Sequence, residues 1–157
     1  MASELLERYR QPVLVEKFIA GDEITVGIVG SRILGIMRVL PRQRTPNFIY
    51  CLEVKRDWER LVDYECPARL EPCVLQKIED VSLTIFRVLG CRDFSRIDFK
   101  ISPEGEPHFL EINPLPGLNP RSGDLPIMAS KMSCTYQELI SLIMNAALER
   151  YPQCVRR

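Results

Sequence analysis

The chain has 157 residues, 46% of them hydrophobic, which suits one domain with a buried core. Its 21 basic and 21 acidic side chains cancel, so no excess of one charge indicates nucleic acid or an anionic membrane as a partner. The charged N-terminus lacks an apolar signal region and no stretch is long enough to span a membrane, so we expect a cytoplasmic protein. The six cysteines have no CxxC spacing and the only histidine is His108, so we expect reduced thiols and no zinc site.

β-Branched and aliphatic residues dominate three early segments, Val13–Val15, Ile24–Val29 and Ile33–Leu40. This composition predicts strands, and the Gly30-Ser31 pair predicts a tight turn that joins the second and third segments as a hairpin. Residues 41–48 contain prolines and arginines without periodicity, so we expect a loop there.

Two helices are predicted further along the chain. Between Leu70 and Gly90, with Pro72 suited to the first turn, one helical face carries Val74, Ile78, Val81, Ile85 and Val88. A second helix begins at Thr135, which forms a capping box with Glu138, and stops before Pro152; its apolar positions are Leu139, Leu142, Ile143 and Ala146. The order of strands, helix, hairpin and helix indicates an α+β fold with a mainly antiparallel sheet flanked by helices.

The later hairpin consists of RIDFKI (residues 96–101) and HFLEIN (residues 108–113). Side-chain alternation predicts a core face with Ile97, Phe99, Ile101, Leu110 and Ile112, and a second face with Arg96, Asp98, Lys100, Phe109, Glu111 and Asn113. A turn centred between Glu104 and Gly105 then pairs Asp98 with Glu111, Arg96 with Asn113, and Phe99 with Leu110.

Two opposed carboxylates whose Cβ atoms lie about 5 Å apart need a positive charge between them. Mg²⁺ binds oxygen ligands at about 2.0–2.1 Å, so Asp98, Glu111 and Asn113 form a candidate metal site. The alternative is that Arg96 and Lys100 neutralise the two acids on a solvated face. The abrupt strand end at residues 114–117, with a glycine that admits close backbone approach to a ligand, favours the metal site.

RIDF followed by FLEINPLPGL (residues 109–118) resembles the metal-binding signature of the ATP-grasp ligases, specifically the D-alanine:D-alanine ligases. VLVEKFIAGDEITV (residues 13–26) is similar to their adenine hinge and ribose-binding glutamate, and YCLEVK (residues 50–55) to the stretch with a phosphate-binding lysine. The resemblance implies an ATP-grasp C-terminal domain over residues 13–151, an N-terminal stub over 1–12 and a C-terminal tail over 152–157.

The resemblance also implies roles for the matched residues. ATP would be bound by Glu16, Lys17, Phe18, Ile19, Glu23 and Lys55, with Glu23 at the ribose and Lys55 at the phosphates. Mg²⁺ or Mn²⁺ would be held by Asp98, Glu111 and Asn113. Arg96 and the N–H group of Gly117 would polarise the substrate carboxylate and stabilise an oxyanion, and Ser122 would contact the substrate.

The implied reaction joins two small amino acids, as in D-alanyl-D-alanine for the cell-wall peptidoglycan. ATP converts a carboxylate into an acyl phosphate, which the amine of the second amino acid attacks. The family also needs N-terminal and central domains, so we expect an excised or truncated portion, inactive alone, of an enzyme that could form homodimers.

Two other interpretations stay open. The loop at residues 119–126 departs from the Ser-Leu pair common in the family, which is compatible with a ligase that makes a different dipeptide or amide. A non-catalytic domain that binds a nucleotide or a partner is the third possibility.

Overall fold

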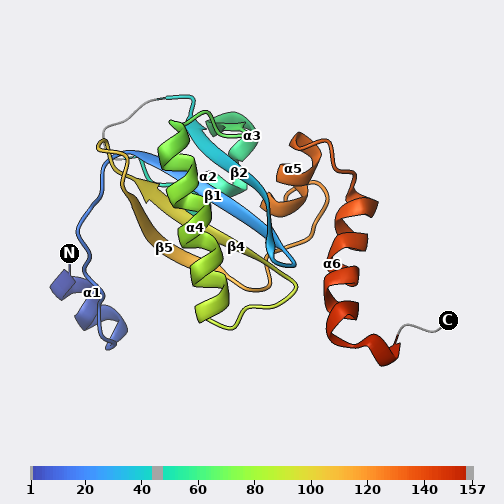
Figure 1. Ribbon diagram of the computed structural model, residues 1–157. Coiled ribbons are helices and arrows are strands. Elements are labelled where there is room, and N and C mark those ends of the chain that lie inside the picture. Colours follow the sequence, from blue (N-terminus) through green and yellow to red (C-terminus); the bar gives the residue numbers. More distant parts are fainter. Residues whose placement is uncertain (1, 44–47, 155–157) are drawn as a thin grey trace.

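The computed structural model describes residues 2–43 and 48–154, and within them five strands form one sheet with helices on both faces (Figure 1). The elements in chain order are α1 (Ala2–Tyr9), β1 (Asp22–Val29), β2 (Arg32–Pro41), α2 (Leu52–Arg56), α3 (Trp58–Leu61), β3 (Val62–Glu65), α4 (Pro72–Val88), β4 (Phe94–Ile101), β5 (Pro107–Asn113), α5 (Asp124–Lys131), α6 (Tyr136–Arg150) and the 3₁₀ turn η1 (Pro152–Cys154). The strand order is β3-β2-β1-β4-β5, and every neighbouring pair is antiparallel, as predicted.

The first predicted hairpin is confirmed, because β1 and β2 pair across Gly30-Ser31 and Gly30 has a φ of 63°, which its missing Cβ permits. The strand predicted at Val13–Val15 is wrong, since this segment lies outside the sheet with Val15 75% exposed. Both hydrogen-bonding sides of β1 are already taken, by β2 and β4. The segment Val13–Val15 therefore has no strand to pair with at β1, and its strand propensity alone does not make it a strand.

The loop predicted over 41–48 begins at residue 42 in the structure, because Pro41 is still the last residue of β2. Residues 44–47 of that segment lie outside the described part of the chain.

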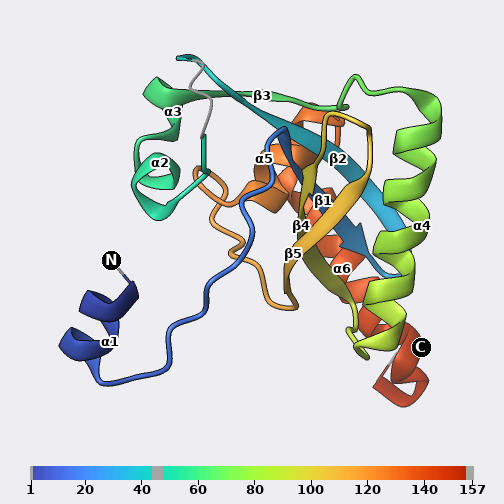
Figure 2. The same ribbon diagram turned by 90° about the vertical axis from the view of Figure 1, so that its left-hand side faces the viewer.

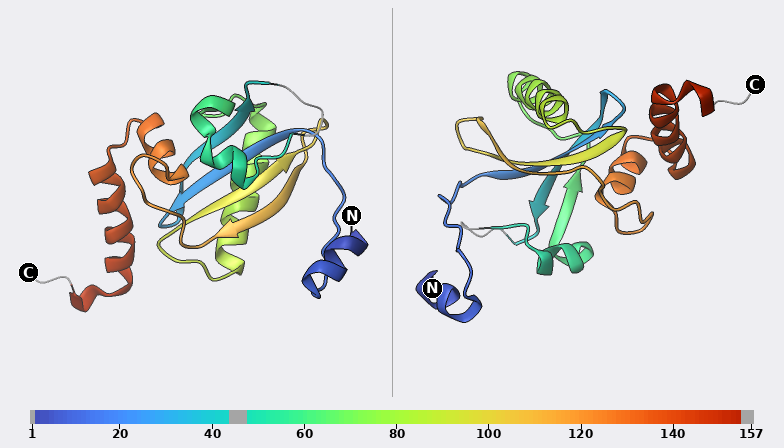
Figure 3. Two further views of the ribbon diagram at one scale, coloured as in Figure 1. Left: turned by 180° about the vertical axis from the view of Figure 1, so that it is seen from behind. Right: turned by 90° about the horizontal axis from the view of Figure 1, so that it is seen from below.

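Helix α4 covers one face of the sheet, as seen from below in Figure 3, and its ends agree with prediction. Its buried side chains are Ile78, Ser82 and Phe86, an i, i+4 row that packs on the apolar face of β1 and β4. The predicted face is wrong at Val81 and Val88, which are 37% and 77% exposed. The buried row passes through a serine instead, because that position faces the sheet.

The opposite face carries α5, α6 and the short helices α2 and α3 (Figure 3). Helix α5 packs very closely on β1, since a Cβ added to Gly27 would lie 2.7 Å from both Leu125 Cδ1 and Met128 Sδ. Helix α6 has the predicted capping box between Thr135 and Glu138. The two apolar predictions Leu139 and Ile143 are buried there, whereas Leu142 is 46% exposed.

The predicted register of β4 and β5 is confirmed where the acids lie, because Asp98 pairs with Glu111 and Arg96 with Asn113. A bulge then shifts the ladder, so that Phe99 pairs with Phe109 rather than with the predicted Leu110. Leu110 is the extra residue of this bulge and is 48% exposed, so its predicted core position is wrong.

Helix α1 lies apart from the sheet at the end of an extended segment (Figure 2). Neither α1 nor the elements α2, α3, β3 and α5 follow from the predicted set. No helix among the described residues is long and apolar enough to cross a membrane. All six cysteines are free, as predicted.

Candidate functional site

A cavity of about 210 Å³ opens on the polar face of the sheet, opposite α4. Strands β1, β4 and β5 supply most of its wall, and α2 with the segment before it supplies the rest. Its lining residues are Glu23, Ile24, Thr25, Tyr50, Lys55, Asp98, Leu110 and Glu111. The structure thus brings together four predicted residues, two assigned to nucleotide and two to metal.

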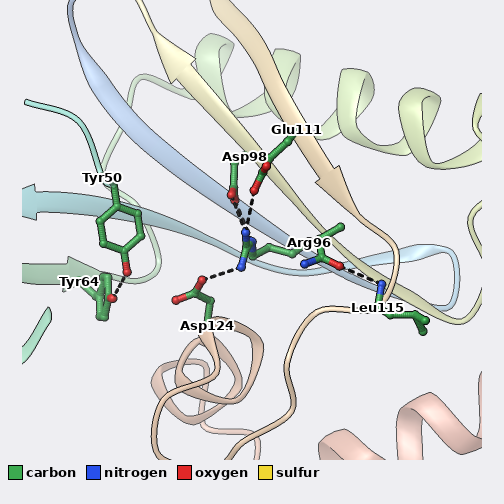
Figure 4. A network of polar contacts seen from close by, with 8 residues as sticks. Tyr50, Tyr64, Arg96, Asp98, Glu111, Leu115 and Asp124 are labelled. Carbon is green, nitrogen blue, oxygen red and sulfur yellow. Dashed lines mark hydrogen bonds and ion pairs between the residues drawn. The ribbon is translucent and has the colours of Figure 1, made fainter. Parts of the chain in front are cut away.

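Arg96 occupies the centre of an ionic network beside this cavity (Figure 4). Its Nε and Nη2 donate to the two oxygens of Asp98 at 3.1 and 2.9 Å, and Nη2 also donates to Glu111 Oε1 at 3.1 Å. The other terminal nitrogen, Nη1, donates to Asp124 Oδ2 at 2.9 Å. One guanidinium therefore binds three carboxylates from β4, β5 and the first residue of α5.

Most of this network is shielded from solvent. The side chains of Arg96, Asp98 and Asp124 are 12%, 14% and 11% exposed, whereas Glu111 is 59% exposed. Burial raises the pKa of Asp98 and of Asp124 above the ordinary aspartate value, although the charge of Arg96 acts in the opposite direction on both. With all four groups ionised the network carries an excess of negative charge, which favours a cation.

The positive group between the two acids is Arg96, as the alternative to a metal site predicted, but Lys100 does not join it. Lys100 is buried and directs its Nζ to the Phe48 carbonyl at 3.2 Å and toward Glu23 Oε1 at 4.0 Å. Glu23 also accepts a hydrogen bond from the Tyr50 N–H at 2.8 Å, and burial raises the pKa of its carboxyl group. The face is thus partly buried rather than solvated.

The carboxylate oxygens of Asp98 and Glu111 suit a hard divalent cation as ligands, since both accept hydrogen bonds from the same nitrogen, Arg96 Nη2. The amide oxygen of Asn113 instead accepts the Leu115 N–H at 3.1 Å. Within the described residues no group of three or more His, Cys, Asp or Glu side chains is placed to hold a metal ion. The structure therefore assembles two of the three predicted metal ligands.

Aromatic rings border the site on the side of α2 and β3. Lys55 Nζ lies 5.0 Å from the centroid of the Tyr50 ring, and the Tyr50 and Tyr64 hydroxyls share a hydrogen bond. Burial raises the pKa of both tyrosines, that of Tyr64 to about 12. Trp58 stacks on Tyr64 at 5.1 Å, so Lys55 approaches the cavity from a packed aromatic support.

The predicted adenine-binding residues are not in this cavity. Lys17, Phe18 and Ile19 line another hollow of about 480 Å³ with the turn between β4 and β5, and Glu16 is exposed on the extended segment. Gly117 and Ser122 are exposed on the loop before α5. The structure does not join these residues to the Arg96 network.

The model of one protein family, described as D-ala D-ala ligase C-terminus, matches residues 1–145. The chain belongs to this family. It is 34% identical over 146 residues to the D-alanine–D-alanine ligase of Pelobacter propionicus, covering 93% of the chain and 46% of that protein. It is also 34% identical over 144 residues to the corresponding ligase of Alcanivorax borkumensis, covering 92% of the chain and 45% of that protein. The chain thus spans about half the length of these curated relatives.

Solved structures share the fold of this D-ala D-ala ligase C-terminal domain. The D-alanine–D-alanine ligase of Bacillus anthracis complexed with ATP superposes with a TM-score of 0.73 at 24% identity, over 96% of the chain and 47% of that structure. The VanG D-Ala:D-Ser ligase of Enterococcus faecalis gives 0.62 at 22% identity, over 83% of the chain and 37% of that structure. The predicted ATP-grasp fold is confirmed.

Sequence reasoning missed several members of the site in this D-ala D-ala ligase domain. Asp124 lies in the divergent loop at residues 119–126, for which the sequence predicts no role in this network, and Leu110 is predicted in the core. Buried Thr25 pairs with Asp98 across β1 and β4 and lines the same cavity, and a polar residue amid the apolar run of β1 was the available signal. Tyr50 lies at the start of the stretch that also contains Lys55, which could have indicated it.

Proposed function

We propose that this chain is the C-terminal part of an ATP-dependent carboxylate–amine ligase that forms a D-alanyl-D-alanine-like dipeptide. The observation that carries the proposal is the single cavity in which Lys55, Asp98 and Glu111 meet. Its support from relatives is that those at 34% identity are named D-alanine–D-alanine ligases and that a structure of the same fold holds ATP. The cytoplasm, peptidoglycan synthesis and a homodimeric whole enzyme are further predictions of the same proposal.

The residues act by binding and by charge. Lys55 presents its ammonium group to the nucleotide phosphates, while Asp98 and Glu111 would hold Mg²⁺ or Mn²⁺. Asn113, whose amide oxygen accepts the Leu115 N–H here, would join them as the third ligand through the second lone pair of that oxygen. When bound, the metal ion neutralises charge on the transferring phosphoryl group. Glu23 offers its carboxylate to the ribose hydroxyls, and Arg96 orients the substrate carboxylate and its acyl phosphate with the N–H of Gly117 and the loop that carries Ser122.

The extended segment completes the nucleotide site in this proposal. Glu16, Lys17, Phe18 and Ile19 border the adenine, with backbone hydrogen bonds from Phe18 and Ile19. The exposure of this segment, with Phe18 45% exposed, supports a surface that a ligand or the remaining half of the enzyme covers.

Titration of Mg²⁺-ATP into the chain tests the nucleotide site. Binding should be weak, because the chain spans only about half the length of its relatives, and it should be lost in Asp98→Ala and Glu111→Ala. Asp63→Ala is the matched control, since it removes a carboxylate that pairs with Arg42 at 2.9 Å on the far edge of the sheet and is 63% exposed. Equal binding by all four proteins would contradict the proposed site and favour a domain that binds a partner without turnover.

ATP-dependent ligation is tested with the full-length protein that contains these residues. ADP release is measured across pairs of small amino acids. Activity with D-alanine in both positions supports the proposal. Indifference to D-alanine with activity on another amine would identify a different ligase on the same fold. One observation favours this second candidate. Asp124 belongs to the divergent loop at residues 119–126, and it pairs with Arg96, so a departure from the family sequence reaches the site itself.

A further inference from the structure

The donors of Arg96 divide into two groups that face different partners. Nε and Nη2 form one edge of the guanidinium, and they serve Asp98 and Glu111, the two carboxylates assigned to the metal ion in the proposed function. Nη1 lies on the other side and donates to Asp124. The proposed function does not assign Asp124 to the metal ion, the nucleotide or the substrate. A divalent ion bound by Asp98 and Glu111 competes with Nε and Nη2, but the contact between Nη1 and Asp124 does not depend on either of them.

The backbone of Asp124 is held in place by contacts that do not involve Arg96. It is the first residue of α5, whose side chains Leu125 and Met128 are fully buried. That helix contacts β1 closely at Gly27, where an added Cβ would lie 2.7 Å from side-chain atoms of Leu125 and Met128. The preceding Gly123 is equally confined, since an added Cβ would lie 2.9 Å from the Asn119 carbonyl oxygen. The backbone position of Asp124 is therefore fixed by packing, and its carboxylate lies within reach of Arg96 Nη1.

We propose that Asp124 is a positioning residue that holds Arg96 through Nη1 and so leaves its Nε and Nη2 edge available to the substrate carboxylate. This inference rests on the proposed function and concerns the same site. Asp98 and Glu111 can then exchange the guanidinium for the metal ion. Arg96 stays in place during this exchange, because its ion pair with Asp124 remains. Without Asp124, Arg96 has only the two metal-binding carboxylates to pair with and competes more strongly with the ion.

Binding of Mn²⁺ to the 157-residue chain, measured by calorimetry, tests this role without any turnover. Asp124→Asn keeps the shape of the side chain and removes its charge, and we expect it to weaken Mn²⁺ binding about tenfold, a typical coupling between contacting groups. The same change in an Arg96→Gln background should alter binding by less than about twofold, because the competitor is absent. Asp124→Glu should restore part of the loss.

Asp93→Asn is the matched control. Asp93 pairs with Arg150 on α6, outside the cavity, and has a φ of 66°, which asparagine also adopts, so Mn²⁺ binding should be unchanged. Thermal unfolding of every variant verifies that it is folded before binding is compared.

Each outcome bears on the inference. An equal loss from Asp124→Asn in both backgrounds would show that Asp124 acts on the ion directly, and no loss in either would show that it has no effect; both overturn the positioning role alone. Absence of Mn²⁺ binding by the unchanged chain overturns the proposed function and this inference together.

Discussion

Arg96→Gln is the most informative single substitution, because it removes the only positive charge in direct contact with three carboxylates of the described site. Glutamine can still donate hydrogen bonds, so the loss is chiefly electrostatic. Asp98 and Asp124 are at most 14% exposed and cannot recover full hydration, whereas Glu111 is 59% exposed and can. Two shielded carboxylates left without their partner should cost about 3 kcal/mol at neutral pH, the lower end for a broken buried pair.

The loss should depend on pH in a defined direction. Burial already raises the pKa of Asp98 and Asp124, and removal of Arg96 takes away the main influence that lowers them. A carboxyl group whose pKa is higher in the folded than in the unfolded state contributes stability below its unfolded pKa and loses that contribution as pH rises through the folded pKa. The deficit of Arg96→Gln should therefore be largest at neutral pH and shrink as both aspartates become protonated.

Urea unfolding followed by circular dichroism at about pH 7 and about pH 5 measures the deficit from the midpoint at constant slope. Arg150→Gln is the control, because Arg150 pairs with one carboxylate, Asp93, and their side chains are 32% and 19% exposed. It should lose no more than about 1 kcal/mol. Equal losses in the two variants, or a deficit for Arg96→Gln that does not shrink in acid, would refute the argument from burial.

Four further substitutions, one of them a control, probe the scaffold and the cavity. Gly27→Ala brings a Cβ to 2.7 Å from two side-chain atoms of α5 and should lower the free energy of unfolding by about 1–2 kcal/mol, whereas Gly117→Ala, with nothing within 4 Å, should change it by less than about 0.5 kcal/mol in the same urea assay. Thr135→Ala removes the capping box of α6 and should cost about 1 kcal/mol. It should also reduce part of the stability lost in acid, because the backbone N–H and the hydroxyl of Thr135 both lower the pKa of Glu138 and alanine keeps only the N–H. The contribution of Glu138 is present above its ordinary pKa and disappears as pH falls through the lowered value. Lys55→Gln should weaken Mg²⁺-ATP binding at least about tenfold in calorimetry while leaving the fold intact, and unchanged affinity would remove Lys55 from the phosphate site.

The sheet could be predicted where the determining forces act between neighbours in sequence. Alternation of apolar and polar residues placed Ile97 and Phe99 in the core, and turn chemistry joined β1 to β2 and β4 to β5. The bulge at Leu110 could not be read in the same way, because an extra residue leaves the alternation on each side of it intact. The strand predicted at Val13–Val15 failed for a related reason, since propensity does not reveal whether a pairing edge is free.

The face of α4 shows the limit of reading apolar periodicity alone. Val74 and Ile85 do pack partly against the core, but the fully buried row continues through Ser82 to Phe86 rather than through Val81 and Val88. Hydrophobicity predicted the helix, but the buried serine shows that packing on the sheet decided which of its sides is covered.

The site divides along the same line between local and tertiary causes. The approach of Asp98 to Glu111 follows from a hairpin register, so it could be predicted from 18 consecutive residues, 96–113. The approach of Asp124 depends on α5 docking against Gly27 in a strand almost a hundred residues earlier, which no local pattern encodes. All three carboxylates nevertheless bind the guanidinium of Arg96. Strand pairing brings Asp98 and Glu111 to it, and the packing of α5 adds Asp124. A change in the packing of α5 should therefore reach the cavity through Arg96 without altering any residue that lines it.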